Sequence, residues 1–180
     1  MTEAFVPDAL AEALRSVELV MLDVDGVLTR GQKLYSACGL LGLEFDTRDG
    51  LGVALLRAVG CTVGIVSNGT SDIIRTRSED LRLDYVVLGS NNKRQSIEEE
   101  VYPRVAVPWD RLLVMGDDIW DIEVMLLAGV SIAPSDAHES ILRVAQYVTK
   151  RPGGRGAVRE MADMVLAAKD IDPLSLLGML

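Results

Sequence analysis

The chain has 180 residues, of which 49% are hydrophobic and 4% aromatic, and its formal net charge is −9. This length suits one domain with an aliphatic core. The negative charge repels phosphate backbones and anionic lipid surfaces, so neither nucleic acid nor a membrane is expected as a partner. Two cysteines, Cys38 and Cys61, are too few for a disulfide framework, which favours a reduced, cytoplasmic protein.

The first segment of the chain, residues 1–16, predicts a short amphipathic helix rather than a signal peptide. Further along, short aliphatic runs recur, and each is bounded by Gly, Asp, Ser or Asn. Runs that are apolar on both faces are typical of strands in a parallel sheet. The predicted strands lie within residues 19–24, 61–67, 85–89, 112–118 and 130–135.

Helical patterns separate the predicted strands. Residues 49–60, for example, place apolar side chains on one stripe and end at Gly60, a typical helix stop. Strands that alternate with helices predict an α/β protein with a doubly wound, mostly parallel, Rossmann-like sheet. The predicted helices cover residues 49–60, 71–83, 92–105, 120–130 and 156–170.

One segment interrupts this alternation between the first strand and the first of these helices. Residues 31–46 contain two short apolar pieces around Gly39 and Gly42, which predicts an inserted β-hairpin. The sequence shows no internal repeat and no linker. We therefore predict a single domain over residues 1–180, with the hairpin insert at about 31–46 and a C-terminal loop and helix at about 150–170.

Polar side chains gather where the predicted strands end, which is the edge at which open α/β sheets bind ligands. The stretch "VMLDVDGVLT", residues 20–29, ends an apolar strand with two aspartates. Like charges this close destabilise each other unless a cation or a shared proton relieves them. The residues at this edge are Asp23 and Asp25, then Ser67 and Asn68, then Lys93, and finally Asp117 and Asp118, with Asp121 further on.

Each of these residues also has an ordinary structural explanation. An aspartate after a strand commonly caps a helix or forms a turn, a lone Ser67 is typical of turns, and a lone Lys93 is typical of solvated surface. Two acidic clusters at neighbouring strand ends favour a Mg²⁺ site instead, because Mg²⁺ prefers oxygen ligands and binds phosphates.

The order and spacing of these residues resemble the four motifs of the haloacid dehalogenase-like phosphatases. The matching stretches are "DVDGVLT" (23–29), "VSN" (66–68), Lys93 and "GDDIWD" (116–121), within a likeness that covers residues 17–168. The short insert, "RDGLGV" (48–53) and "GGRGAVRE" (153–160) resemble the small-cap branch that hydrolyses 3-deoxy-D-manno-octulosonate 8-phosphate. That branch also includes phosphatases of nonulosonate (sialic-type) 9-phosphates.

The resemblance implies phosphoryl transfer through an aspartyl phosphate. Asp23 is then the nucleophile, and Asp25 is the general acid and base. Mg²⁺ is held by Asp23, the backbone carbonyl of Asp25 and Asp117, with Asp118 in support. Ser67, Asn68 and Lys93 hold the phosphoryl oxygens.

The resemblance also implies an assembly and a sugar-binding set. In this branch four chains form a ring, the hairpins build a central barrel, and each active site lies between subunits. Arg155 is then the candidate that grips a sugar carboxylate, and Arg77 is a substrate-facing arginine. The expected substrate belongs to the pathway of lipopolysaccharide or related surface sugars.

The chain departs from the branch at Gly69. The octulosonate enzymes place an arginine there and a nonulosonate relative a glutamate, whereas glycine offers neither charge nor hydrogen bond. The phosphatase chemistry is expected to be intact, with 3-deoxy-D-manno-octulosonate 8-phosphate as the first substrate candidate and a nonulosonate 9-phosphate as the alternative.

Two hypotheses of other classes remain open from the sequence. A phosphoacceptor receiver domain shares the sheet and the acidic pocket, but its phosphorylated aspartate follows the third strand, and "YVVLG" here ends without one. A non-catalytic assembly or partner-binding module would keep the fold without the chemistry, since fold alone does not determine function.

Overall fold

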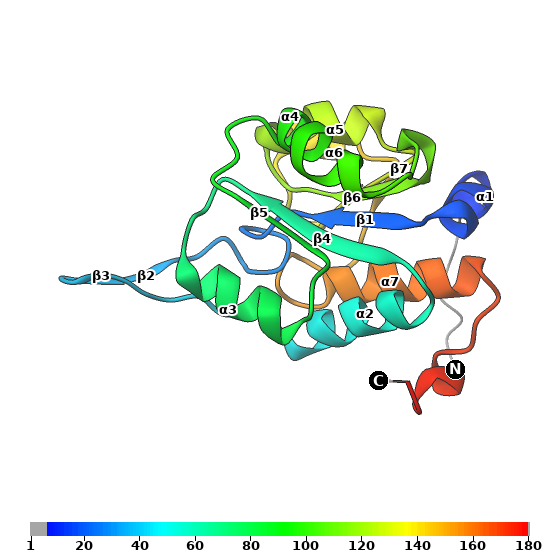
Figure 1. Ribbon diagram of the computed structural model, residues 1–180, viewed down its shortest axis with the longest axis horizontal. Coiled ribbons are helices and arrows are strands. Elements are labelled where there is room, and N and C mark those ends of the chain that lie inside the picture. The colour runs from blue at the N-terminus through cyan, green and yellow to red at the C-terminus, as the bar shows by residue number, and fades with distance from the viewer. Residues whose placement is uncertain (1–6, 180) are drawn as a thin grey trace.

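A computed structural model describes residues 7–179 and has a six-stranded parallel sheet at its centre (Figure 1). In chain order its strands are β1 (Leu19–Leu22), β4 (Thr62–Ser67), β5 (Tyr85–Leu88), β6 (Leu112–Met115), β7 (Val130–Ala133) and β8 (Tyr147–Val148). Across the sheet the order is β5-β4-β1-β6-β7-β8, and every neighbouring pair is parallel. The predicted doubly wound α/β fold is confirmed.

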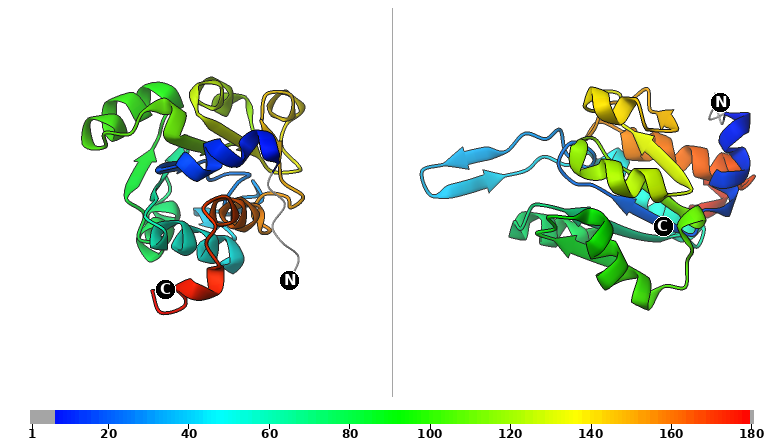
Figure 2. Two further views of the ribbon diagram at one scale, coloured as in Figure 1. Left: turned by 90° about the vertical axis from the view of Figure 1, so that its right-hand side faces the viewer. Right: turned by 90° about the horizontal axis from the view of Figure 1, so that it is seen from above.

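Helices cover both faces of the sheet, as Figures 1 and 2 show. One face packs against α1 (Asp8–Ser16), α2 (Thr47–Ala58), α3 (Asp72–Asp80) and α7 (Ala157–Ala168), and the other against α4 (Lys93–Ser96), α5 (Ile122–Leu127) and α6 (Glu139–Leu142). The central strands β1 and β6 are buried at every position because they are covered on both sides. In the described residues no helix is long and apolar enough to span a bilayer.

The predicted hairpin is confirmed and projects from the edge of the sheet where the strands end (Figure 1). It consists of β2 (Leu34–Ser36) and β3 (Gly39–Gly42), which pair in antiparallel orientation. Its strands lie outside the main sheet, so the insert adds a protrusion rather than a seventh strand.

The structure differs from the prediction at one helix and at one additional strand. The predicted helix at 92–105 is divided into α4, a π-helical turn η1 (Ile97–Val101) and a 3₁₀ turn η2 (Tyr102–Arg104). Pro103 explains the end, because proline lacks the N–H group that a continuing helix requires. The sequence analysis missed β8, whose two residues are too few to form a recognisable run.

Short turns complete the described chain. They are the 3₁₀ turns η3 (Trp109–Arg111), η4 (Ile119–Asp121) and η5 (Pro173–Leu176). Three residues separate η4 from β6. Asp117 and Asp118 precede η4 and Asp121 ends it, so the local geometry of this turn decides which of these acids reaches the sheet edge. The helix predicted from residue 1 begins at Asp8, and residues 1–6 lie outside the described part.

Candidate active site

The candidate site lies at the carboxyl ends of three adjacent strands, β4, β1 and β6. Parallel pairing brings these ends to one edge, because Leu22 is in register with both Ile65 and Met115. Asp23 follows β1 directly, and its backbone N–H donates to the carbonyl of Met115, which continues the ladder by one residue. Residues that lie far apart in the sequence therefore meet at this edge.

A buried lysine joins two of the aspartates. Lys93 Nζ lies 2.7 Å from Asp23 Oδ1 and 2.6 Å from Asp121 Oδ1, and all three side chains are almost fully buried. Lys93 is the first residue of α4, whose N-terminus is capped by the side chain of Asn92, and this cap fixes where the lysine enters the site. A buried ammonium group requires such partners, because an unpaired buried charge is costly.

Asp117 completes the acidic cluster. Carboxylate oxygens of Asp23, Asp117 and Asp121 all lie within 4.8 Å of one another. Gly26, with φ +96°, makes room for Asp117, since a Cβ at Gly26 would lie 1.9 Å from Asp117 Oδ2. The glycine within the first motif is therefore required both by its left-handed backbone and by the carboxylate that it faces.

Two acids of the cluster, Asp23 and Asp117, have raised pKa values, because they are withdrawn from water and the positive charge close to them does not balance their negative charge. Burial raises the pKa of Asp23 to about 6, while Lys93 opposes this rise. Burial, together with the negative charge of Asp23, raises the pKa of Asp117 to about 8. One buried cation, Lys93, is shared by three acids, so the cluster favours either protonation or a further cation.

The donor set fits a hard divalent cation. All three carboxylates offer oxygen, and Asp117 Oδ1 is buried without a hydrogen-bond partner in the part of the chain that the structure describes. A buried, unpaired carboxylate oxygen that faces other carboxylates is a free ligand position for an ion such as Mg²⁺.

Asp25 lies beside the second strand end. The position that a Cβ would take at Gly69 is 3.7 Å from Asp25 Oδ2 and 3.3 Å from Ser67 Oγ, so the acid and the hydroxyl flank Gly69. Ser67 is buried and its Oγ accepts the N–H of Gly69 at 3.0 Å, which leaves the hydroxyl hydrogen to donate elsewhere. Asp25 Oδ1 is likewise buried and unpaired among residues 7–179.

Sequence reasoning missed a lysine that contacts Asp25. Lys33 Nζ lies 2.8 Å from Asp25 Oδ2, and the hydrogen bond that it donates to this carboxylate raises the pKa of Lys33. Lys33 precedes β2 at the base of the hairpin, ten residues after Asp23. No local pattern marks this lysine, because the contact depends on how the chain between β1 and the hairpin brings residue 33 back to Asp25.

Asp121 occupies the place in the cluster that the sequence analysis gave to Asp118. Asp118 is exposed and caps η4 by accepting the N–H of Ile119 at 2.7 Å. Asp121 is buried, accepts from Lys93, and accepts the backbone N–H groups of Asp117 and Asp118 through Oδ2 at 3.2 and 3.3 Å. The spacing inside "GDDIWD" contained this signal, since one helical turn brings the last acid back over the first.

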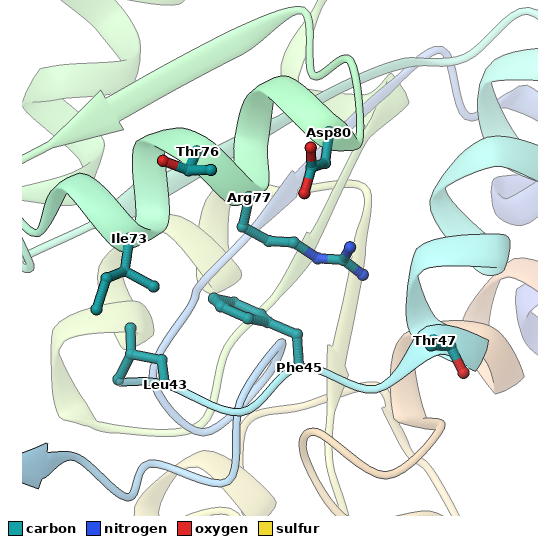
Figure 3. Close-up of a pocket in the computed structure, with 7 residues that line it drawn as sticks. All are labelled: Leu43, Phe45, Thr47, Ile73, Thr76, Arg77 and Asp80. Carbon is teal, nitrogen blue, oxygen red and sulfur yellow. The ribbon is translucent and has the colours of Figure 1, made fainter. Parts of the chain in front are cut away.

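Arg77 lies in a pocket between α3 and the segment that returns from the hairpin (Figure 3). Its guanidinium stands 5.5 Å from the centre of the Phe45 ring, and its Nε is buried with no partner in the described residues. The pocket has a volume of about 400 Å³. Its lining residues are Leu43, Phe45, Thr47, Ile73, Thr76, Arg77 and Asp80.

The remaining predicted residues lie at the surface. Asn68 is exposed just beyond β4. Arg155 is exposed in the glycine-rich loop before α7, and its carbonyl accepts from Arg48 at 3.3 Å. This loop packs closely on the turn after β1: the N–H of Gly154 donates to the carbonyl of Val27 at 2.8 Å, and a Cβ at Gly153 would lie 1.7 Å from the carbonyl oxygen of Gly26.

The arrangement of acids, hydroxyl and lysine at the sheet edge has a counterpart in a known family. A family model described as haloacid dehalogenase-like hydrolase matches residues 65–161. The chain is also 32% identical to the 3-deoxy-D-manno-octulosonate 8-phosphate phosphatase KdsC of Yersinia pestis over 165 residues, which are 92% of this chain and 88% of that protein. The chain belongs to the haloacid dehalogenase-like hydrolase family.

Solved structures of octulosonate phosphatases also superpose closely on this chain. The Yersinia pestis octulosonate phosphatase superposes with a TM-score of 0.89 over 92% of this chain and 89% of that one. A cobalt-bound phosphatase of this type from Haemophilus influenzae is 34% identical, with a TM-score of 0.85 over 88% of this chain and 92% of that one. The Moraxella catarrhalis enzyme, in complex with magnesium, phosphate and KDO, is 25% identical, with a TM-score of 0.89 over 96% and 98% of the two chains. The predicted class, a phosphatase, is confirmed.

Proposed function

We propose that the chain is a Mg²⁺-dependent phosphomonoesterase that acts on 3-deoxy-D-manno-octulosonate 8-phosphate through an aspartyl phosphate. One observation carries the proposal: Asp23, Asp117 and Asp121 are packed around one buried lysine, with Asp25 and Ser67 at the adjacent strand end. The proposed substrate is the one stated in the names of the KdsC relatives.

In the first half-reaction a carboxylate oxygen of Asp23 attacks phosphorus, and the bond from phosphorus to the sugar oxygen breaks. Asp25 donates a proton to the departing sugar oxygen as general acid. In the second half-reaction Asp25 takes a proton from water, which attacks the phosphorus. Inorganic phosphate leaves, and the Asp23 carboxylate is restored.

The other residues at this edge hold the phosphoryl group. Ser67 Oγ and Lys93 Nζ donate hydrogen bonds to its oxygens, and exposed Asn68 follows at the same strand end. When bound, Mg²⁺ offsets the repulsion between the anionic nucleophile and the anionic phosphate. Its protein ligands would be Asp23, Asp117 and the carbonyl of Asp25. Asp121, which is buried against Lys93, would orient the metal ligands, and Asp118, which is exposed, would support the metal site from its solvent side.

The sugar part of the substrate extends toward the Arg77 pocket in this proposal. The guanidinium there has an unpaired Nε and a matching charge for a carboxylate. Gly69, which lies beside Ser67 and Asp25, favours a second candidate. Glycine offers no side chain to limit the size of the sugar there, so a longer nonulosonate 9-phosphate is the alternative substrate.

The hairpin supports a homotetramer with active sites between subunits. Leu34, Tyr35 and Leu41 are 61%, 65% and 62% exposed on a projecting two-stranded element, where nothing in the described chain covers them. Arg155, on its exposed loop, would then reach a neighbour's substrate. Replacement of both leucines by aspartate should convert the tetramer to monomers in sedimentation velocity, whereas a monomeric unaltered protein would contradict the assembly. The cytoplasmic location stays a prediction.

The decisive experiment measures phosphate release from a panel of sugar phosphates with and without Mg²⁺. The panel contains 3-deoxy-D-manno-octulosonate 8-phosphate, nonulosonate 9-phosphates and neutral hexose phosphates, and Asp23→Asn is the control. We expect one keto-acid phosphate to be preferred and the control to lose about 10⁴-fold or more in kcat. Release by Asp23→Asn at the unaltered rate would favour a site elsewhere. No release from any substrate would favour the non-catalytic module.

A further inference from the structure

The contact between Lys33 and Asp25 places a cation next to the proposed general acid. Lys33 Nζ and Asp25 Oδ2 are 2.8 Å apart. Asp25 must reach the oxygen that links phosphorus to the sugar, because it donates the proton to that atom. A group in hydrogen-bond contact with Asp25 therefore lies on the sugar side of the site, beyond the phosphoryl group.

Lys33 is accessible to a ligand, whereas the other lysine of the site is not. The side chain of Lys33 is 38% exposed and that of Lys93 is 3% exposed. The two lysines therefore have different roles in the proposed site. Lys93 is buried between Asp23 and Asp121, beneath the phosphoryl position, whereas Lys33 is partly exposed to solvent. A partly exposed ion pair is weak, so an incoming anion competes readily for the ammonium group.

The position of Lys33 also connects Asp25 with the Arg77 pocket. Lys33 directly precedes Leu34, which is in register with Gly42 in the hairpin, and Leu43 comes next and lines the pocket. The base of the hairpin thus lies between the catalytic edge and that pocket. Gly69, whose Cβ position would lie 3.7 Å from Asp25 Oδ2, contributes no side chain, whereas Lys33 brings an ammonium group into direct contact with the same carboxylate oxygen.

We propose that Lys33 is a specificity residue that binds the carboxylate of the sugar-acid leaving group. Its flexible four-carbon stem lets the ammonium group move from Asp25 to a substrate anion a few ångströms further out. The enzyme then distinguishes an anionic sugar phosphate from a neutral one of similar size by this lysine. The proposal rests on the proposed function, because it assigns a part of the same substrate.

The test compares the selectivity of four proteins: unaltered, Lys33→Gln, Lys33→Arg and Arg30→Gln. Arg30 is the matched control, since it lies on the same loop, carries the same charge, and pairs with Glu44 instead of Asp25. The quantity measured is kcat/KM for 3-deoxy-D-manno-octulosonate 8-phosphate divided by kcat/KM for mannose 6-phosphate. We expect Lys33→Gln to lower this ratio about tenfold, mainly through KM for the acid, Lys33→Arg to restore most of it, and Arg30→Gln to leave it unchanged.

An equal loss on both substrates in Lys33→Gln would overturn the proposal, because it would show that the lysine only supports Asp25. If the unaltered protein hydrolyses neither substrate, the proposed function fails first, and calorimetry then tests Lys33 separately. There the probes are the free sugar acid, 3-deoxy-D-manno-octulosonate, and mannose. About tenfold weaker binding of the acid alone by Lys33→Gln supports the proposal, and equal binding by the two proteins rejects it.

Discussion

The catalytic edge of the sheet and the base of the hairpin face the same opening but are built differently. At the edge, Asp23, Lys93 and Asp121 are buried and linked by contacts of 2.6 and 2.7 Å on strand ends and helix termini. At the hairpin base, the side chain of Lys33 is 38% exposed, and nearby on α3 Arg77 has a buried nitrogen without a partner in the described chain. Rigid elements hold the proposed chemistry, and the insert holds the proposed selectivity, so the two should respond differently to mutation.

The largest loss of activity is expected at Gly26, where the catalytic edge leaves no room for a Cβ atom. Gly26→Ala places a Cβ 1.9 Å from Asp117 Oδ2, at φ +96°, so the carboxylate must move. A displacement of about 1 Å at a reacting centre lowers the reaction rate roughly 100-fold. We therefore expect kcat/KM to fall by that factor or more.

Gly39→Ala is the matched control for this change. Gly39 also has a positive φ, +116°, but nothing lies within 4 Å of its Cβ position. It should cost only about 1 kcal/mol of local strain and leave Mg²⁺-dependent turnover intact. Equal losses in the two variants would show that backbone strain, and not the contact with Asp117, limits activity.

A smaller effect is expected from the acid that the sequence analysis left without a role. In Asp121→Asn the amide NH₂ must face either Lys93 or the backbone N–H groups of Asp117 and Asp118. In both orientations a hydrogen-bond donor then faces another donor, and one hydrogen bond is lost. We expect Mg²⁺ affinity, measured by calorimetry, to fall about 10- to 100-fold. In Asp118→Asn it should hardly change, because asparagine caps η4 equally well. The reverse order would return Asp118 to the metal site.

The pH dependence of the edge should follow the raised pKa values of its acids. Asp23 and Asp117 have pKa values of about 6 and about 8, above their unfolded values. Without metal, these groups contribute stability that is fully present below their unfolded pKa of 3.8 and is lost as pH rises from there through the folded values of about 6 and about 8. Because Mg²⁺ binds the deprotonated forms, and the fraction with both acids ionised rises about 100-fold between these pH values, its affinity should rise by about that factor from pH 6 to pH 8.

Thermal unfolding in EDTA and in Mg²⁺ at both pH values checks this prediction. The stabilisation by Mg²⁺ should be larger at pH 8 than at pH 6. A stabilisation by Mg²⁺ that is the same at pH 6 and pH 8 would indicate that the acids are already ionised and that the cluster is more solvated than its burial indicates.

The smallest effect is expected in the pocket beside the hairpin. Arg77→Gln removes the guanidinium that stands over Phe45, and we expect KM for the sugar acid phosphate to rise about fivefold with little change in kcat. Arg75→Gln, on the exposed face of the same helix, is the control and should leave KM unchanged. An effect on kcat alone would place Arg77 in the chemistry and not in sugar binding.

The sequence by itself determined the sheet, its helices and the chemical edge. Aliphatic runs that end in Asp23, Ser67 and Asp117 predict parallel strands, and parallel strands bring their carboxyl ends to one edge. The hairpin insert was also predictable, because its two glycines interrupt a short apolar segment. These features depend on local pattern and on topology, which a single sequence contains.

Only the tertiary structure decided which polar groups touch. Asp121 entered the cluster in place of Asp118 because η4 turns one acid inward and leaves the other to cap the turn. Lys33 contacts Asp25 because the chain between β1 and the hairpin returns to the sheet edge, and the pocket around Arg77 is closed by the segment that leaves the hairpin. Such contacts join segments whose spacing in the chain carries no periodic signal, so their geometry is set by packing between elements and not by local propensity.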